Sequence, residues 1–337
     1  MDPKRLISIT EAFPTARVAV IGDCMLDRYT WGTAARISQE APVPVVRAER
    51  MTVSPGGAAN AMRTLACLGA ETLAFGPLGE DAAGEELRTV LEDIGVDTAG
   101  LVTVKGRRTS EKTRILAGAQ QVVRVDMEDT EPIGADTEQA LLERLRAALA
   151  NDGIAAIIVQ DYAKGAVSEK LLRQTVRMAS DAGVPVALDP HAANAFNIPG
   201  LFLMTPNRAE AFALAGRHFT DARLPLTEDA ALRQTVDALE GAWKVKNLLV
   251  TLGPAGMALF RAGEAPVYFP TQAREVFDVS GAGDTVIAVC VLAAVCGANI
   301  EEAAILANHA AGVVVGKVGT APIYPHELLA SFETPDP

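Results

Sequence analysis

The sequence has few cysteine, histidine and aromatic residues, and it has no long hydrophobic run. Its four cysteines form no C-x-x-C pair, and its four histidines lack the spacing of zinc ligands, so we expect a protein of the reducing cytoplasm without a structural metal. The longest apolar run, residues 286–296, is shorter than the ~18 residues needed to cross a membrane, and it predicts a buried helix. The N-terminus does not resemble a signal peptide.

Basic residues are also in deficit. The chain of 337 residues has 30 Lys and Arg against 42 Asp and Glu, a formal net charge of −12. This charge disfavours nucleic acids and anionic membranes as partners, so an anionic ligand must be bound by a local cluster of bases. With 49% hydrophobic and 21% charged residues, the chain has the composition of a folded protein with a large core.

Short apolar segments alternate with segments of helical length along most of the chain. RVAVIGD (residues 17–23) and NLLVTLG (residues 247–253) are examples of the apolar segments. This alternation predicts an α/β fold with three layers, in which helices cover both faces of a mostly parallel sheet within one domain over residues 1–333.

Two segments, about residues 24–53 and 99–127, alternate polar with apolar residues instead. Such a period of two is typical of a sheet with one face in water, so we expect the two segments to pair into a small β-sheet lid beside the core. An isolated small sheet has apolar edges that favour pairing, so the lid also predicts a homodimer.

The segment DVSGAGDT, residues 278–285, places a Gly-Ala-Gly turn directly before an acid at the start of the apolar run. Glycines at a helix start let backbone N–H groups converge on an anion, and the helix dipole adds positive charge there. Asp284 can then accept a proton from a hydroxyl group that attacks phosphorus. Asp is also a common helix N-cap, so the motif alone leaves a catalytic base and a cap as equal alternatives.

Other glycine, amide and acidic residues are placed where ligands bind in α/β folds. Asp27 follows the first strand, and Gly56 and Gly57 precede a helix with Asn60 in its first turn. Asn207 and Glu210 lie three residues apart at a helix start, which suits a hydrated magnesium ion beside phosphates. Gly253 and Gly256 follow another strand and offer a second phosphate or nucleotide contact.

With GGAAN near its start and D-x-x-GAGD near its end, the chain resembles carbohydrate kinases of the PfkB/ribokinase family over residues 15–332. The strings RISQEAPVPVV, QDYAKGA and PTQAREVFDVSGAGDTVI are most similar to D-glycero-β-D-manno-heptose-7-phosphate kinases, either stand-alone or as the kinase domain of the bifunctional kinase/adenylyltransferase. The resemblance implies a ribokinase-like fold and ATP-dependent phosphorylation of the heptose 7-phosphate at C1, for lipopolysaccharide precursor synthesis. It implies ATP and Mg²⁺ as cofactors, with a monovalent cation as an open option.

The resemblance also assigns roles to single residues. It makes Asp284 the catalytic base and the turn of Gly281, Ala282 and Gly283 the anion hole. The residues that face the sugar are Asp27, Gly56, Gly57 and Asn60. The residues of the ATP and magnesium site are Asn207, Glu210, Thr251, Gly253, Gly256 and Asn308, with Glu210 binding magnesium through water.

The substrate phosphate requires bases, and Lys164, in the QDYAKGA string, and Arg114, in the lid, are the candidates. Lys112, Arg114 and Arg124 alternate along the lid and are expected to share a face, although each could equally be a solvated surface cation. Tyr162 is interpreted as a packing residue.

Some features separate the chain from its relatives or leave alternatives open. His191 stands in DPHAAN where the heptose kinases have a lysine, and the chain lacks the HxGH motif of a nucleotidyl-transferring domain, so a kinase alone is expected. A kinase for another sugar or a fructose phosphate is the alternative enzyme. A sugar-phosphate sensor is disfavoured by the intact Asp284, Asn207 and Glu210. A dehydrogenase is disfavoured because no G-x-G-x-x-G follows the first strand.

Overall fold

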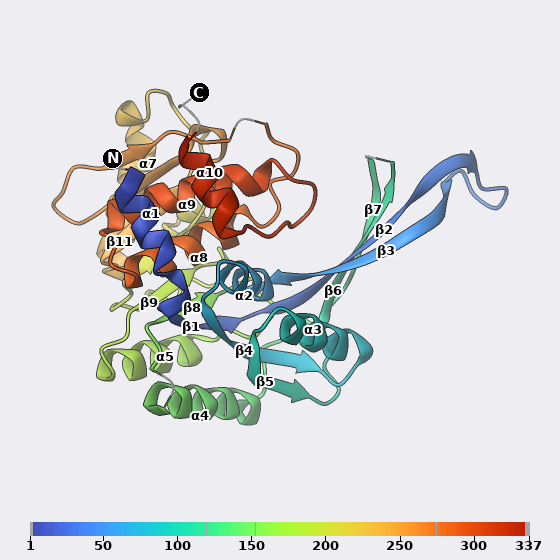
Figure 1. The fold of residues 1–337 in the computed structure, drawn as a ribbon, viewed down its shortest axis with the longest axis horizontal. Coiled ribbons are helices and arrows are strands. Elements are labelled where there is room, and N and C mark those ends of the chain that lie inside the picture. Colours follow the sequence, from blue (N-terminus) through green and yellow to red (C-terminus); the bar gives the residue numbers. More distant parts are fainter. Residues whose placement is uncertain (1–2, 119, 152, 274, 334–337) are drawn as a thin grey trace.

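The computed structural model describes residues 3–118, 120–151, 153–273 and 275–333, and its main body is a nine-stranded sheet between two layers of helices (Figure 1). Neighbouring strands in this sheet are parallel, except at one edge, where a hairpin of the last two strands continues the sheet in the antiparallel sense. The spatial order is β13 (Val267–Phe269), β12 (Met257–Phe260), β11 (Asn247–Thr251), β10 (Leu203–Met204), β9 (Val186–Asp189), β8 (Ala156–Gln160), β1 (Arg17–Gly22), β4 (Glu71–Gly79) and β5 (Asp97–Val104). This confirms the predicted architecture.

The helices divide between two hydrophobic cores, one on each face of the sheet. One core contains residues of α1 (Pro3–Glu11), α2 (Ala58–Cys67), α3 (Ala82–Asp93), α8 (Ala282–Val295), α9 (Ile300–Val315) and α10 (Pro325–Glu333). The other contains residues of α4 (Ala135–Asn151), α5 (Glu169–Asp181), α6 (Arg208–Leu214) and α7 (Ala230–Trp243). Helix α8 is buried along most of its length, as its apolar sequence predicts. In the described part of the chain, no helix combines the length and the apolar character of a membrane span.

A separate four-stranded lid sheet projects from the body (Figure 1). Its order is β3 (Pro44–Gly57), β2 (Cys24–Ile37), β6 (Ser110–Ala117) and β7 (Gln120–Met127). The lid was predicted, but its second segment begins at residue 110 and not near residue 99. Residues 97–104 form β5, which pairs with β4 at the edge of the main sheet. An edge strand is also partly exposed, so its polar and apolar residues alternate as they would in a lid.

The register of the lid strands gives the sheet two different faces. Asp27 pairs with Lys112, and Tyr29 pairs with Arg114, which pairs in turn with Arg124. Paired residues point to the same side of a sheet, so these side chains share the face that we call the inner face. This confirms the predicted common face of the three bases. The opposite, outer face carries the exposed apolar residues Met51, Val123, Val125 and Met127.

Candidate functional site

The Asp284 carboxylate lies in the first turn of α8, where the carboxyl ends of the central strands meet this helix. It is 3% exposed and accepts hydrogen bonds from side chains of distant segments. Asn60 Nδ2 donates to Oδ2 at 2.7 Å, Gln160 Nε2 donates to Oδ1 at 3.1 Å, and the Tyr162 hydroxyl donates to Oδ1. Gly281, not Asp284, occupies the N-cap position of α8. The arrangement therefore favours the catalytic interpretation of Asp284 over the capping one.

Burial raises the pKa of Asp284 from 3.8 to about 6, and the charge of Asp27 adds to this effect. The hydrogen bonds from Tyr162 and Asn60 and the charge of Arg63 act in the opposite direction. Burial raises the pKa of Tyr162 well above 10, so its phenol stays neutral and can donate to the carboxylate. At neutral pH Asp284 is therefore ionised but more basic than an exposed carboxylate, which suits a general base.

The turn before Asp284 requires glycine at its first position. Gly281 has a φ of 81°, in the left-handed region, and a Cβ there would lie 2.5 Å from Asn60 Nδ2. The Ala282 N–H donates to the Val279 carbonyl at 3.3 Å. The N–H groups of Gly283 and Asp284 belong to the first helical turn, where the helix supplies no carbonyl acceptor. These groups can therefore stabilise a negatively charged ligand beside the carboxylate.

The residues predicted to face the sugar meet where the lid joins α2. Asp27 is 4% exposed and accepts a hydrogen bond from Arg114 Nη1 at 2.6 Å. A Cβ at Gly56 would lie 2.7 Å from Asp27 Oδ2, so a larger residue would displace this carboxylate. Gly57 is the N-cap of α2 with a φ of 56°, and this helix presents Asn60 to Asp284. The structure thus brings the predicted sugar residues together around the base.

A cavity of about 370 Å³ lies beside the Gly-Ala-Gly turn. Its lining includes four residues predicted for the nucleotide: Thr251, Gly253, Gly256 and Asn308. Ala282 and Gly283 also line it, so the cavity leads directly to the anion-binding turn. Its remaining wall is mainly apolar and includes Met257, Val276, Val279, Val286, Ala311 and Val315. An apolar cavity that ends at backbone N–H groups fits a purine nucleotide whose phosphates approach Asp284.

Asn207 and Glu210 form the capping box of α6. Asn207 Oδ1 accepts from the Glu210 N–H at 3.0 Å, and Glu210 Oε2 accepts from the Asn207 N–H at 2.8 Å. They do not line the cavity, although Asn207 is paired with Thr251, which does. The structure thus gives both residues a structural role that the sequence analysis did not weigh.

The same region could hold a hydrated magnesium ion. Burial raises the pKa of Glu210, and burial together with the charges of Glu210 and Asp284 raises the pKa of Asp189 well above its usual value. A divalent cation would relieve this repulsion, so the oxygen donors fit magnesium. Among the described residues, no group of three His, Cys, Asp or Glu side chains is arranged to hold a metal. An ion there would therefore keep water and phosphate oxygens as most of its ligands.

The bases predicted for a substrate phosphate have acidic partners in this structure. Lys164 Nζ lies 2.6 Å from Glu128 Oε1, and Lys112 contacts the same carboxylate at 3.2 Å. Arg114 is paired with Asp27. A bound phosphate would compete with these carboxylates for the bases. Two further bases that the sequence analysis missed, Arg107 and Arg108, line a small cavity with Lys164; their signal was the adjacent pair in the turn KGRRT.

The interpretation of Tyr162 as a packing residue was wrong, because its hydroxyl donates to the candidate base. Gln160, at the end of β8, was also missed. Asp23 holds this segment in place, since its carboxylate accepts the backbone N–H groups of Tyr162, Lys164 and Ala166 at 2.8, 3.1 and 2.9 Å. The position of QDYAKGA directly after a buried strand was the available signal.

His191, in the string DPHAAN after β9, lies near the acids of this region. Its charge lowers the pKa of Glu210 and of Asp161 and so opposes the effect of their burial.

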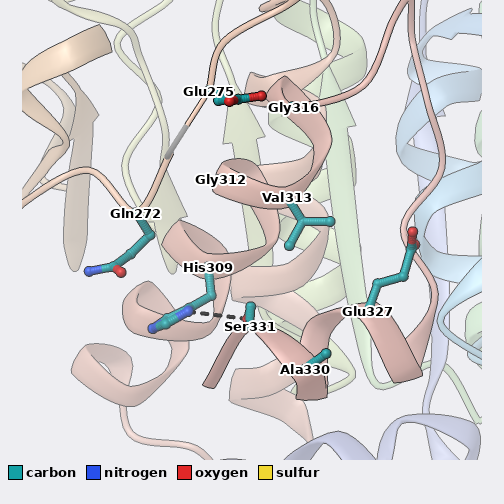
Figure 2. Close-up of a pocket in the computed structure, with 9 residues that line it drawn as sticks. All are labelled: Gln272, Glu275, His309, Gly312, Val313, Gly316, Glu327, Ala330 and Ser331. Atoms are coloured by element: carbon teal, nitrogen blue, oxygen red, sulfur yellow. Dashed lines mark hydrogen bonds between the residues drawn. The ribbon is translucent and has the colours of Figure 1, made fainter. Parts of the chain in front are cut away.

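A second cavity, of about 480 Å³, lies on another side of α9, between this helix, α10 and the segment that carries Gln272 and Glu275 (Figure 2). His309 Nδ1 and Ser331 Oγ are 3.2 Å apart in its wall. Gly312 lines both cavities, but Asp284 and the residues predicted for the sugar do not line this one. The residues predicted for the nucleotide therefore line the first cavity, and Gly283, the neighbour of Asp284, lines it with them.

Comparisons with known proteins connect this geometry to a family. The model of the pfkB family carbohydrate kinases matches residues 15–327. The bifunctional protein HldE of Citrifermentans bemidjiense is 40% identical over 330 residues, which cover 98% of this chain and 66% of that protein. The HldE protein of Edwardsiella ictaluri is 42% identical over 316 residues, 94% of this chain and 63% of that protein. The chain thus spans about two thirds of the length of these relatives or slightly less.

Solved structures show the same fold. Escherichia coli phosphofructokinase-2 in complex with substrates and products has a TM-score of 0.75 and 21% identity, over 94% of this chain and 98% of that chain. The same enzyme has also been solved in complex with potassium. Arabidopsis thaliana ribokinase with ribose and ATP has a TM-score of 0.70 and 24% identity, over 95% of this chain and 99% of that chain. The predicted ribokinase-like fold is therefore confirmed.

The assignment of the nucleotide to the smaller cavity can be tested with Ala311→Phe. The new ring fills part of the cavity and leaves less room for a ligand, so we expect it to weaken binding of ADP by about tenfold or more. Isothermal titration calorimetry measures the change. The matched control is Val313→Phe, also on α9 but in the wall of the second cavity, which should leave ADP affinity unchanged. Equal affinities in the two variants would contradict the assignment.

Proposed function

The chain belongs to the pfkB family of carbohydrate kinases, and we propose that it transfers the γ-phosphoryl group of ATP to the C1 hydroxyl of D-glycero-D-manno-heptose 7-phosphate. The product is the 1,7-bisphosphate, a precursor of ADP-heptose and of the lipopolysaccharide core. The observation that carries the proposal is the buried Asp284, which lies between the sugar residues Asp27 and Asn60 and the cavity for the nucleotide. The choice of heptose 7-phosphate rests on the strings RISQEAPVPVV and QDYAKGA, and the identity with the HldE proteins supports it.

In the proposed reaction, the C1 hydroxyl group replaces Tyr162 or shares its place as a donor to Asp284. The carboxylate accepts the proton while the sugar oxygen attacks the γ-phosphorus in line with the departing ADP oxygen. The N–H groups of Gly283 and Asp284 stabilise the charge that develops on the phosphoryl oxygens. Glu210, beside Asn207, would hold magnesium through water, and the bound ion would neutralise part of the phosphate charge.

The residues that would hold the sugar phosphate are Lys164 and Arg114. Both are already paired with carboxylates, so the substrate phosphate must exchange partners with Glu128 or Asp27 when it binds. A phosphorylated sugar therefore binds more tightly than a neutral sugar only if its phosphate reaches these bases and replaces their carboxylate partners. A kinase for another sugar or sugar phosphate is the alternative within the same family.

We also propose that the protein is cytoplasmic. ATP is abundant in the cytoplasm, and the cysteines of the chain, Cys24, Cys67, Cys290 and Cys296, are all free thiols. A monovalent cation is a further cofactor that we propose for this enzyme, and a potassium titration of the activity tests it.

Replacing the base tests the chemistry. We expect Asp284→Asn to keep the fold and ADP binding but to lower kcat by about 10²-fold or more, the range for loss of a positioned general base. In the unmodified protein, kcat/KM should fall as the pH drops through about 6, because the Asp284 carboxylate then binds a proton and cannot accept one from the substrate. The slope below that pH should approach about tenfold per pH unit. A variant with normal turnover would reduce Asp284 to a structural acid.

The acceptor is tested by ATP consumption with heptose 7-phosphate, fructose 6-phosphate, fructose 1-phosphate, ribose and fructose. A site built for a phosphate leaves its bases without that partner when a neutral sugar binds, so kcat/KM for ribose or fructose should be lower by on the order of 10³-fold or more. Lys164→Ala should raise KM for the heptose phosphate far more than KM for ATP. The control is Lys170→Ala, which removes a lysine of α5 that is paired with Glu138 of α4. An unphosphorylated sugar as best substrate would leave only the broader kinase assignment.

We also propose a homodimer in which the outer face of the lid is covered by the lid of a second copy. Met51, Val123, Val125 and Met127 are 60%, 44%, 47% and 50% exposed on this face, an unusual apolar surface for a solvated sheet. Light scattering at micromolar concentration should give twice the chain mass, and Val125→Lys should give a monomer because it places a charge in the apolar contact. A monomeric unmodified protein would contradict the dimer.

A further inference from the structure

Arg63 is a buried arginine one helical turn after Asn60 in α2. It is 7% exposed, and each of its terminal nitrogens has a defined acceptor. Nη2 donates to Asn60 Oδ1 at 2.5 Å and to the Thr320 carbonyl at 2.7 Å, and Nη1 donates to Ser54 Oγ. One guanidinium group therefore connects α2, the end of lid strand β3 and the segment that follows α9.

The acceptors of Arg63 are neutral oxygens, so hydrogen bonds alone do not compensate its charge. Burial lowers the pKa of Arg63, whereas Cys67 and then the charges of Asp284 and Asp27 raise it. A buried cation is costly unless negative charge lies nearby, and here the nearby carboxylates are the candidate base and a sugar-binding acid. This position suggests a role in the site and not only in packing.

The hydrogen bond to Asn60 also has a directional consequence. An Asn side chain has one acceptor oxygen and one donor nitrogen, and Arg63 can bind only the oxygen. With Oδ1 held by Arg63, Nδ2 faces Asp284 Oδ2 and donates to it at 2.7 Å. If the Asn60 amide turned over, its oxygen would face the carboxylate and its nitrogen would face the guanidinium, and both contacts would be repulsive.

We propose that Arg63 is a positioning residue for phosphoryl transfer, because it fixes the Asn60 amide against Asp284 and supplies the positive charge that favours the ionised base. The inference rests on the proposed function, in which Asp284 is the general base.

The surroundings of Asp284 support this role. The titratable groups that face it are Asp27 from β2, Tyr162 from the segment after β8, Asp189 from the end of β9 and Arg63 from α2. Among these four described residues, Arg63 is the one with a positively charged side chain. Removing its charge therefore leaves the carboxylate among acids and a phenol, which favours its protonated form.

The test is the pH dependence of kcat/KM for Arg63→Met, measured with the best sugar phosphate of the substrate panel. Methionine keeps much of the apolar volume but removes the charge and the hydrogen bonds. We expect the acid limb, the low-pH side of the profile, to move measurably to higher pH, because the positive charge that favours the ionised carboxylate and the orientation of its Asn60 donor are both lost. The matched control is Arg88→Met. Arg88, on α3, donates to the Thr98 and Leu101 carbonyls of β5, so its loss should not shift the pH profile.

Arg63→Lys distinguishes the effect of the positive charge from the effect of the hydrogen bonds. It also tests the proposal if the methionine variant does not fold. A lysine keeps the positive charge but cannot hold Asn60, Ser54 and Thr320 with a planar fork, so the acid limb should stay in place while kcat falls about tenfold. An unchanged limb in a folded Arg63→Met variant, or an unchanged kcat in Arg63→Lys, overturns the proposal.

The inference and the proposed function can fail separately. If Asp284→Asn retains turnover, Asp284 is not the base and the proposed mechanism fails. If Asp284→Asn is inactive while the Arg63 variants have the unmodified profile and turnover, the mechanism stands and Arg63 is only a structural residue.

Discussion

The site depends on a carboxylate that is kept out of water at the start of a buried helix. Removing Asp284 from solvent makes its charge costly, and that cost makes it a stronger base than an exposed aspartate. The amides of Asn60 and Gln160 and the phenol of Tyr162 limit the cost, so the group is still ionised at neutral pH. Because these donors come from α2, β8 and the segment after β8, the packing of α8 against α2 and β8 is a condition for the proposed chemistry.

An acidic protein for which we propose two phosphorylated substrates must solve an electrostatic problem. In this chain the positive potential comes from local sources: the N–H groups at the start of α8, the bases on the inner face of the lid and the buried Arg63. The ion pairs of Lys164 and Arg114 keep these bases oriented, and an arriving phosphate can exchange with Glu128 or Asp27. In the proposed function, phosphate binding is thus an exchange of partners and not simple attraction.

The sequence predicted the parts of the site that depend on backbone geometry. Glycine turns before helices and after strands can be recognised locally, and Gly253, Gly256 and Gly283 do line one cavity with Thr251 and Asn308. Contacts between distant side chains could not be predicted in this way. Tyr162 and Asp284 are 122 residues apart, and Arg63 reaches the Thr320 carbonyl across 257 residues, so only the fold brings these groups together. The boundary near residue 99 was wrong for a related reason, since an edge strand and a lid strand have the same alternation.

The pairing of the lid has a consequence for its covalent continuity. Strand β2 is hydrogen-bonded to β3 on one side and to β6 on the other, although β6 begins more than 50 residues after β3 ends. A break of the backbone between β2 and β3, at residues 38–43, would leave both strands held in the sheet. Several connections therefore hold the lid to the rest of the chain. At its tip, residues 38–43, the polypeptide could be cut, lengthened or given new termini without releasing Asp27 from the site.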